Sequence, residues 1–173
     1  VLATGLGTSL LPALRQHVIR RDEQALRNDF QLTMRLSILL SGVATVGLVA
    51  IMPSVNQLLF GSSAGSDALA LFTISIVPAT LIVVSTSVLQ SFDKTRGLGW
   101  FVLLTMLVKA GLNIWLVPIF GIAGASLATV GALLPFLIFT LVRLPKSLWI
   151  SWVPKKWWRK LIAILLAVGI LAR

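Results

Sequence analysis

Long apolar runs recur along this sequence, and they constrain its fold more than any other feature. A helix rises about 1.5 Å per residue, so about 20 apolar residues cross the roughly 30 Å hydrocarbon core of a bilayer. Apolar residues make up 57% of the chain and charged residues 12%, which leaves too little polar surface for a water-soluble globule. The sequence therefore predicts an all-α, polytopic membrane helix bundle with about six transmembrane helices. Their apolar runs are 1–14, 31–53, 68–91, 97–118, 121–142 and 159–172.

The first and last runs are shorter than the others, and the first lacks an initiator methionine. We therefore expect the chain to be part of a longer polytopic protein. Residues 1–142 are predicted to hold five membrane-spanning helices with short loops. Residues 143–158 are predicted to form an interfacial linker rich in basic residues and tryptophan, and residues 159–173 to begin a further transmembrane helix. No signal-peptide pattern is visible.

Lys and Arg residues are distributed unevenly among the predicted loops. If the first run ends in the cytoplasm, the outer loops at 61–67 and near Gly121 contain no basic residue. Short loops rich in Lys and Arg stay on the cytoplasmic side of a membrane. The pattern therefore predicts a multi-pass protein of the plasma membrane with its basic loops in the cytoplasm. These basic loop residues are Arg15, Arg20, Arg21, Arg27, Lys94, Arg96, Arg143, Lys146, Lys155, Lys156, Arg159 and Lys160.

The net charge of +10 indicates an anionic partner. A nucleic-acid partner would require one solvated basic face, whereas these basic residues lie beside membrane spans, so we expect no nucleic acid. The anionic inner leaflet of the bilayer fits better, because each Lys or Arg near it contributes about 1 kcal/mol. The linker either anchors the chain there or recognises one lipid headgroup. Its expected interface anchors are Trp149, Trp152, Trp157, Trp158, Lys155 and Lys156.

Several chemistries find no support in the sequence. There is no cysteine, and the single histidine, His17, lies in a predicted loop. No GxSxG, P-loop or metal-spaced cluster is present. We therefore predict no enzyme activity, no cofactor and no metal.

Lys109 lies inside the run 97–118, roughly 18 Å along the helix from Gly97. A lysine at such depth costs about 2.5–3.5 kcal/mol unless protein, water or an anion compensates. Asn113, one turn further on, shares its face. We predict that this face looks into a hydrated cavity and contacts substrate; the alternative is a lysine bonded to carbonyls of a neighbouring helix. Arg35 is a weaker substrate-contact candidate, because it lies near the cytoplasmic end and can snorkel.

None of the acidic residues lies deep within a predicted membrane span. Asp67 begins the span at 68–91, and the others lie in predicted cytoplasmic loops, namely Asp22, Glu23, Asp29 and Asp93. A carrier of cations usually needs a buried carboxylate, whereas a carrier of anions needs buried cations. The pattern therefore favours an anionic substrate.

Prolines and small residues indicate the architecture. Pro78 is predicted to kink its helix or serve as a hinge. Pro12, which follows Thr8 and Ser9, indicates an interrupted helix end, and such ends line transporter sites, so Thr8 and Ser9 are further substrate-contact candidates. A stripe of small residues predicts close helix packing or, alternatively, a sliding surface. Its members are Gly121, Ala125, Ala128 and Ala132.

Three segments together resemble one protein family. They are GLGTSLLPALRQHVIRRDEQALRND, SVLQSFDKTR and LVKAGLNIWLVPIFGIAGASLATVGALL. Their order and spacing are similar to those of the MOP superfamily, which includes MurJ-type lipid II flippases, polysaccharide exporters and the drug-exporting MATE proteins. The resemblance covers nearly the whole chain. It implies the eighth to thirteenth helices of a fourteen-helix protein, which form most of a MATE/MOP-like C-terminal lobe.

The resemblance also implies a function. Two lobes would rock about a central cationic cavity. The lobe described by this sequence would pack against the missing N-terminal lobe of the same protein. The substrate would be a polyprenyl-diphosphate-linked oligosaccharide, either peptidoglycan lipid II or a polysaccharide repeat unit, exported by alternating access. The alternatives are a MATE-type cation-coupled multidrug exporter and a non-transport role as a membrane scaffold or as the membrane part of a lipid-modifying enzyme.

Overall fold

The computed structural model describes residues 15–17, 19–20, 22–61, 65–145 and 148. Across these residues all regular secondary structure is helical and no strand occurs, which confirms the predicted all-α fold. Several predictions lie outside the described residues. They are the spans 1–14 and 159–172, the residues Thr8, Ser9 and Pro12, and the interface anchors Trp149, Trp152, Lys155, Lys156, Trp157 and Trp158.

Four described stretches are long and apolar enough to cross a membrane, namely Glu23–Leu59, Ser66–Ser91, Leu98–Phe120 and Ile122–Arg143. The chain is therefore a polytopic helix bundle. The second stretch is interrupted, so the helices are α2 (Glu23–Phe60), α3 (Ser66–Thr73), α4 (Ile76–Ser91), α5 (Leu98–Phe120) and α6 (Ile122–Arg143).

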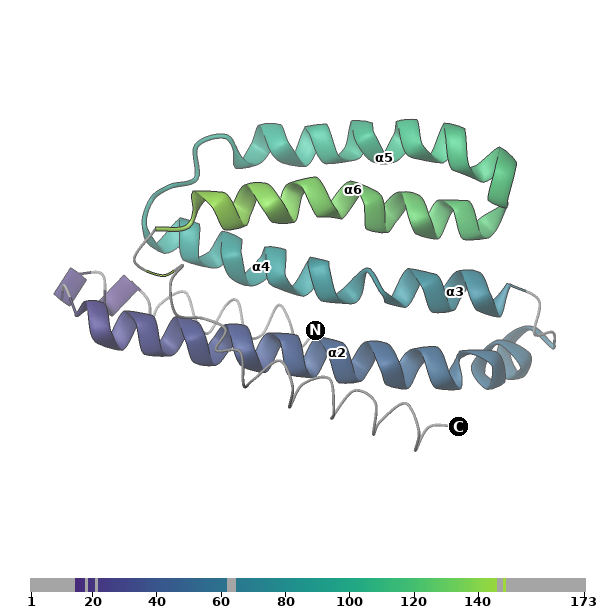
Figure 1. Ribbon diagram of the computed structural model, residues 1–173, viewed down its shortest axis with the longest axis horizontal. Coiled ribbons are helices and arrows are strands. Elements are labelled where there is room, and N and C mark those ends of the chain that lie inside the picture. Colours follow the sequence, from purple (N-terminus) through teal and green to yellow (C-terminus); the bar gives the residue numbers. More distant parts are fainter. Residues whose placement is uncertain (1–14, 18, 21, 62–64, 146–147, 149–173) are drawn as a thin grey trace.

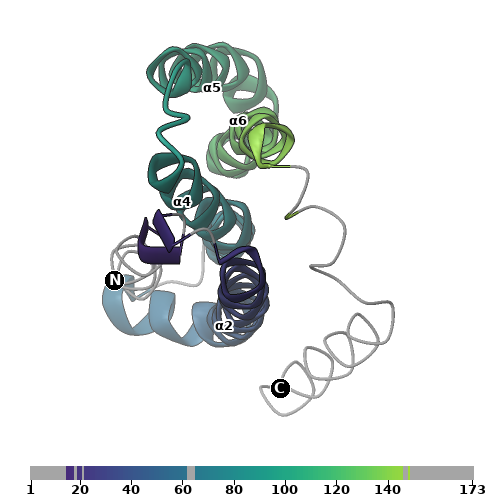
Figure 2. The same ribbon diagram turned by 90° about the vertical axis from the view of Figure 1, so that its left-hand side faces the viewer.

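The helices lie side by side in one row, in the order α5, α6, α3 with α4, and α2 (Figures 1 and 2). Helix α6 packs against α5 on one side and against α3 and α4 on the other. The helices of the row have a common end, at which three parts of the chain meet (Figure 1). They are the start of α2, the turn between α4 and α5 and the end of α6. We call this common end the basic end, because Arg27, Lys94, Arg96 and Arg143 lie there.

Helix α2 is longer than the apolar run 31–53 that predicted it. It begins after Asp22, whose Oδ1 accepts a hydrogen bond from the Ala25 N–H at 3.0 Å, a favourable N-cap. Its first turns are amphipathic, since Leu26 and Phe30 are buried while Arg27 is exposed. The helix therefore continues past the end of the apolar run because its buried side still packs.

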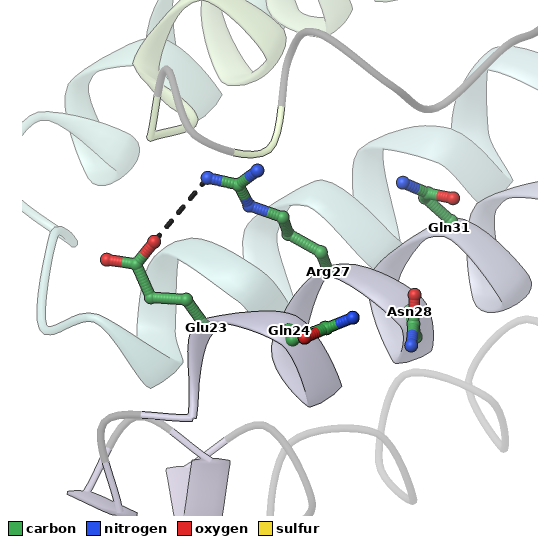
Figure 3. A pocket seen from close by; sticks show the side chains of 5 residues that line it. All are labelled: Glu23, Gln24, Arg27, Asn28 and Gln31. Atoms are coloured by element: carbon green, nitrogen blue, oxygen red, sulfur yellow. Dashed lines mark hydrogen bonds and ion pairs between the residues drawn. The ribbon is translucent and has the colours of Figure 1, made fainter.

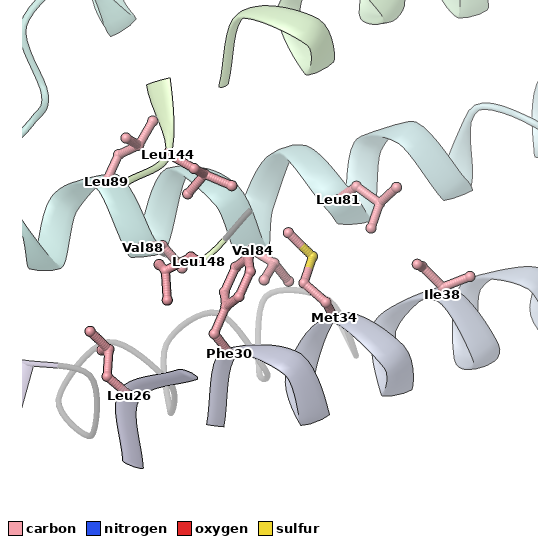
Figure 4. Packing of buried hydrophobic residues seen from close by; sticks show 10 residues of the cluster. All are labelled: Leu26, Phe30, Met34, Ile38, Leu81, Val84, Val88, Leu89, Leu144 and Leu148. Carbon is pink, nitrogen blue, oxygen red and sulfur yellow. The ribbon is translucent and has the colours of Figure 1, made fainter. Parts of the chain in front are cut away.

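The main apolar core lies between α2 and α4 (Figure 4). Leu26, Phe30, Met34 and Ile38 recur every fourth residue and form one stripe of α2. The stripe packs against α4 and against the chain that follows α6. The residues that complete the cluster are Leu81, Val84, Val88, Leu89, Leu144 and Leu148.

The break between α3 and α4 falls at Ile74 and Ser75. Pro78 lies buried in the first turn of α4, and its missing N–H leaves the Ile74 carbonyl without the usual helical partner. Hydroxyl groups supply hydrogen bonds around the break. The Ser75 Oγ donates to the Phe72 carbonyl at 2.7 Å, and the Thr45 Oγ1 from α2 contacts the Thr73 carbonyl at 3.3 Å.

Helices α5 and α6 form a tight antiparallel hairpin. Gly121 makes the turn with φ 58° and ψ −136°, a conformation that suits glycine. At Gly124 the backbones approach so closely that a Cβ atom would collide with the Leu116 carbonyl. Further along the hairpin, the rings of Phe101 and Phe139 stack with centroids 3.4 Å apart. The close approach of the two backbones joins these helices firmly.

The predicted small-residue stripe lies along α6. Ala128 and Ala132 are fully buried, Ala125 is half-buried and Gly121 lies in the turn. Nearby, the Ser126 Oγ donates to the Ala68 carbonyl of α3 at 2.7 Å. Small side chains thus accompany the close packing of α6 in the middle of the row.

Candidate functional site

Helix α5 is the most exposed helix of the row, and none of its residues is buried. It packs against α6 through one half-buried stripe, formed by Leu98, Phe101, Thr105, Val108, Leu112 and Leu116. The spacing of three and four residues is that of a single helix face. The rest of α5 therefore faces either lipid or the remainder of the protein.

One exposed face of α5 has the character of a lipid contact. Trp100 and Trp115 are each 78% exposed, and they lie about 22 Å apart along the axis on nearly the same side. Tryptophan prefers the interfacial layers of a bilayer, and one of these two tryptophans lies toward each end of α5. Leu107 and Ile114 between them are 70% and 74% exposed. We call this the tryptophan face.

Lys109 lies on the other side of α5. It is nine residues from Trp100, which rotates it by about 180° around the helix. It lies eleven residues after Leu98, about 16 Å along a helix about 34 Å long, and hence near the middle of the span. Lys109 is exposed and makes no hydrogen bond or ion pair with any residue that the structure describes. Inside the described row, its charge has no partner.

Asn113 lies one turn beyond Lys109 and is half-buried. Its Oδ1 atom is buried and has no hydrogen-bond partner among the described residues. A buried acceptor without a partner costs about 1–3 kcal/mol. Lys109 and Asn113 therefore form a polar patch near the middle of the apolar helix α5 that the described helices leave without partners.

Arg35 does not join this patch. It lies on α2, at the opposite edge of the row from α5 (Figures 1 and 2). Arg35 is half-buried, and its Nε atom is buried without a hydrogen-bond partner among the described residues. The predicted substrate contacts on described helices thus form two separate groups, namely Lys109 with Asn113 on α5, and Arg35 on α2.

The basic end holds the ion pairs of the described residues. The His17 Nε2 lies 3.0 Å from Asp29 Oδ2, Arg27 pairs with Glu23 at 3.4 Å, and Arg15 approaches Asp93 at 3.6 Å. The contact of His17 was not predicted, because residues 17 and 29 are brought together only by the turn before α2. No group of three or more His, Cys, Asp or Glu side chains within the described part of the chain could hold a metal.

A polar hollow of about 460 Å³ also lies at the basic end, against the first turns of α2 (Figure 3). Its described lining is Glu23, Gln24, Arg27, Asn28 and Gln31. From the sequence, Glu23 and Arg27 are predicted only as charges of a cytoplasmic loop, and the sequence predicts no role for Gln24, Asn28 and Gln31. Hydropathy does not indicate such a hollow, because nearly all of its lining precedes the apolar run 31–53.

Comparison with known proteins identifies the chain's relatives. The family model described as "Lipid II flippase MurJ" matches residues 1–172. The chain is 32% identical over 157 residues to a protein of Bacillus subtilis (strain 168) named "Uncharacterized membrane protein YabM". The match covers 87% of this chain and 28% of that relative, so the chain spans little more than a quarter of the relative's length.

Proposed function

The chain belongs to the MurJ lipid II flippase family, and from this premise we propose that it forms part of a flippase for a polyprenyl-diphosphate-linked oligosaccharide. The cargo would be peptidoglycan lipid II or a polysaccharide repeat unit. The protein would act as a transporter in the plasma membrane rather than as an enzyme. The basic end would lie in the cytoplasm, as the positive-inside rule requires.

The observation that carries the proposal is the position of Lys109. Lys109 lies near the middle of the α5 span, on the side of the helix away from the tryptophan face, with no partner among the described residues. A diphosphate inside a low-dielectric cavity would interact strongly with this charge. Lysine is a compact charge on a flexible stem, so it could follow the diphosphate as the cargo turns over.

Asn113 would complement the charge. Its amide contains both a donor and an acceptor, and the Oδ1 atom is free of described partners. The acceptor suits a sugar hydroxyl, and the donor suits a phosphate oxygen. The pair would thus contact the cargo where the diphosphate joins the sugar.

The packing of the row suggests how the site could move. The α5–α6 hairpin is held by the close contact at Gly124, so Lys109 would move with both helices as a unit. The break at Ile74 and Ser75, next to Pro78, is the described interruption within a span. We propose that this break serves as a hinge during alternating access.

Transport by the complete protein tests the proposal. Flipping of lipid-linked cargo would be measured for Lys109→Ala, Lys109→Glu and Lys109→Arg, with Lys94→Ala as the control because Lys94 is exposed in the turn after α4. We expect Ala and Glu to reduce flipping at least about tenfold, and Arg to retain most of it, because the charge interaction is the common factor. Wild-type flipping by both Lys109→Ala and Lys109→Glu would overturn the proposal.

Depletion of the protein in cells separates the proposed cargo from drug export. Accumulation of lipid-linked sugar intermediates supports the flippase. Sensitivity to cationic drugs without such accumulation would instead support the multidrug exporter.

A further inference from the structure

The polar hollow and Arg35 lie on the same side of α2, and this relation supports a second binding site. Gln24, Asn28, Gln31 and Arg35 follow one another at intervals of four, three and four residues, which places them within about 60° of one another around the helix. The first three line the hollow. We infer that this polar stripe of α2 binds the headgroup of an anionic glycerophospholipid, with Arg35 contacting the phosphate. This inference does not depend on the flippase proposal.

Arg35 has the free donor that such a site needs. Its Nε atom is buried and lacks a hydrogen-bond partner among the described residues. Guanidinium groups bind phosphate through two parallel N–H bonds, one of which often comes from Nε. Arg35 lies about 6 Å deeper than Gln31, and helical side chains lean toward the N-terminus. Arg35 is not itself part of the described lining, but a side chain with this lean would extend toward the end of α2 at which the hollow lies.

An apolar stripe for acyl chains lies beside the polar one. Leu32, Leu36 and Val43 are 58%, 41% and 37% exposed, and they lie about 60–100° around α2 from Arg35. A lipid with its phosphate at Arg35 can therefore extend its chains along this exposed stripe. The apolar stripe begins beside the hollow at Leu32 and continues past Arg35 to Val43, so the acyl chains would extend beyond Arg35 along Leu36 and Val43.

The charges near the hollow select a monoanion. Arg27 is paired with Glu23 at 3.4 Å, as Figure 3 shows, which leaves Arg35 as the unpaired cation of the stripe. One cation matches the single charge of a phosphodiester, whereas a diphosphate would call for more. The site therefore suits a glycerophospholipid rather than the lipid-linked cargo.

The amide groups select the headgroup. Gln24 and Asn28 line the hollow with amide groups that contain both donors and acceptors, which suits hydroxyl groups. An ammonium headgroup would prefer a carboxylate, but Glu23 is already paired with Arg27. Phosphatidylglycerol, which carries one negative charge and two hydroxyl groups on its headgroup, combines both properties.

Lipid binding to the purified full-length protein tests the inference. Dissociation constants for dioleoylphosphatidylglycerol would be measured by native mass spectrometry for the wild type, Arg35→Gln and Arg96→Gln. We expect Arg35→Gln to weaken binding at least about tenfold, because it removes the charge-assisted pair. Arg96→Gln, which removes one exposed charge at the same end, should change it less than about twofold.

Two further measurements cover the headgroup and the alternative ligand. Asn28→Leu should abolish the wild-type preference for phosphatidylglycerol over phosphatidylmethanol, a monoanion without hydroxyl groups. On the wild type, phosphatidylglycerol should displace a bound fluorescent phosphatidylglycerol better than undecaprenyl diphosphate does, even if Arg35→Gln fails to fold. Equal binding by Arg35→Gln and Arg96→Gln, or stronger displacement by undecaprenyl diphosphate, would overturn the inference.

Discussion

At the scale of single residues, Asn113 is a polar group that the fold does not satisfy. Its Oδ1 atom is buried without a described partner, so removing it relieves an unfavourable interaction rather than breaking a favourable one. For Asn113→Leu in the full-length protein we therefore predict an unchanged or higher melting temperature together with at least about fivefold slower flipping. Thermal unfolding in detergent and a flipping assay measure the two effects.

Ser37 provides the matched control for this prediction. Its Oγ atom is likewise buried without a described partner, but it lies on α2, away from Lys109. Ser37→Ala should leave both melting temperature and flipping at or above the wild-type level. A clear loss of stability in Asn113→Leu, or equal losses of flipping in the two variants, would contradict a substrate role for Asn113.

The residue that carries the candidate site was visible in the sequence, whereas its surroundings were not. Lys109 is conspicuous because a charge inside an apolar run has few explanations. The missing partner of Asn113 and the separation of Arg35 from Lys109 depend on which helices become neighbours. Hydropathy does not indicate which helices become neighbours, because all of the spans are similarly apolar.

At the scale of elements, the α5–α6 hairpin depends on one glycine. A Cβ at Gly124 would collide with the Leu116 backbone, whereas Gly111 on α5 has open space. We predict that Gly124→Ala lowers the melting temperature, in line with a cost of about 1–3 kcal/mol for overpacking. Gly111→Ala should leave it unchanged or raise it slightly, because alanine favours helix by up to about 1 kcal/mol.

The measurement is thermal unfolding of the two full-length variants in the same detergent. Both substitutions add one methyl group to a helix, so their difference isolates the helix contact. Equal melting temperatures would show that the backbones of α5 and α6 do not approach each other closely at Gly124.

The apolar runs predicted some helix boundaries well and others poorly. The runs 97–118 and 121–142 lie close to α5 and α6, because Gly97 directly precedes α5 and Gly121 separates α5 from α6. The run 31–53 covers only the middle of α2, since its amphipathic first turns remain helical outside the apolar stretch. The run 68–91 includes α3 and α4, and Pro78 predicted a disturbance there. The actual break at Ile74 and Ser75 precedes it by about one turn.

At the scale of the whole molecule, the basic end decides the orientation. The described turns at that end contain Lys94 and Arg96, whereas Gly61 and Gly121 mark the opposite end (Figure 1). We predict that Thr95→Cys reacts with a membrane-impermeant thiol reagent only after the cells are permeabilised, and that Asp67→Cys reacts in intact cells. Both positions are exposed in the structure. The reverse pattern of labelling would place the basic end outside.

The order of the helices in the row determines which surfaces remain for the rest of the protein. Helix α6 lies in the middle, and α2 and α5 lie at the edges (Figure 2). An edge helix has exposed faces on several sides. Helix α5 therefore presents apolar residues on its tryptophan face and the polar residues Lys109 and Asn113 on another face. With this division, one helix could contact lipid on its tryptophan face and the proposed hydrated cavity on the face of Lys109 and Asn113.

The central claim is that water reaches Lys109 within the bilayer, and cysteine accessibility tests it most directly. Lys109→Cys and Leu107→Cys would be placed singly in a cysteine-free full-length protein and treated in membranes with a charged thiol reagent. The two positions differ by about 3 Å in depth but lie on nearly opposite sides of α5. We predict rapid modification of Lys109→Cys and none of Leu107→Cys. Equal protection of both positions in the folded protein would contradict the claim.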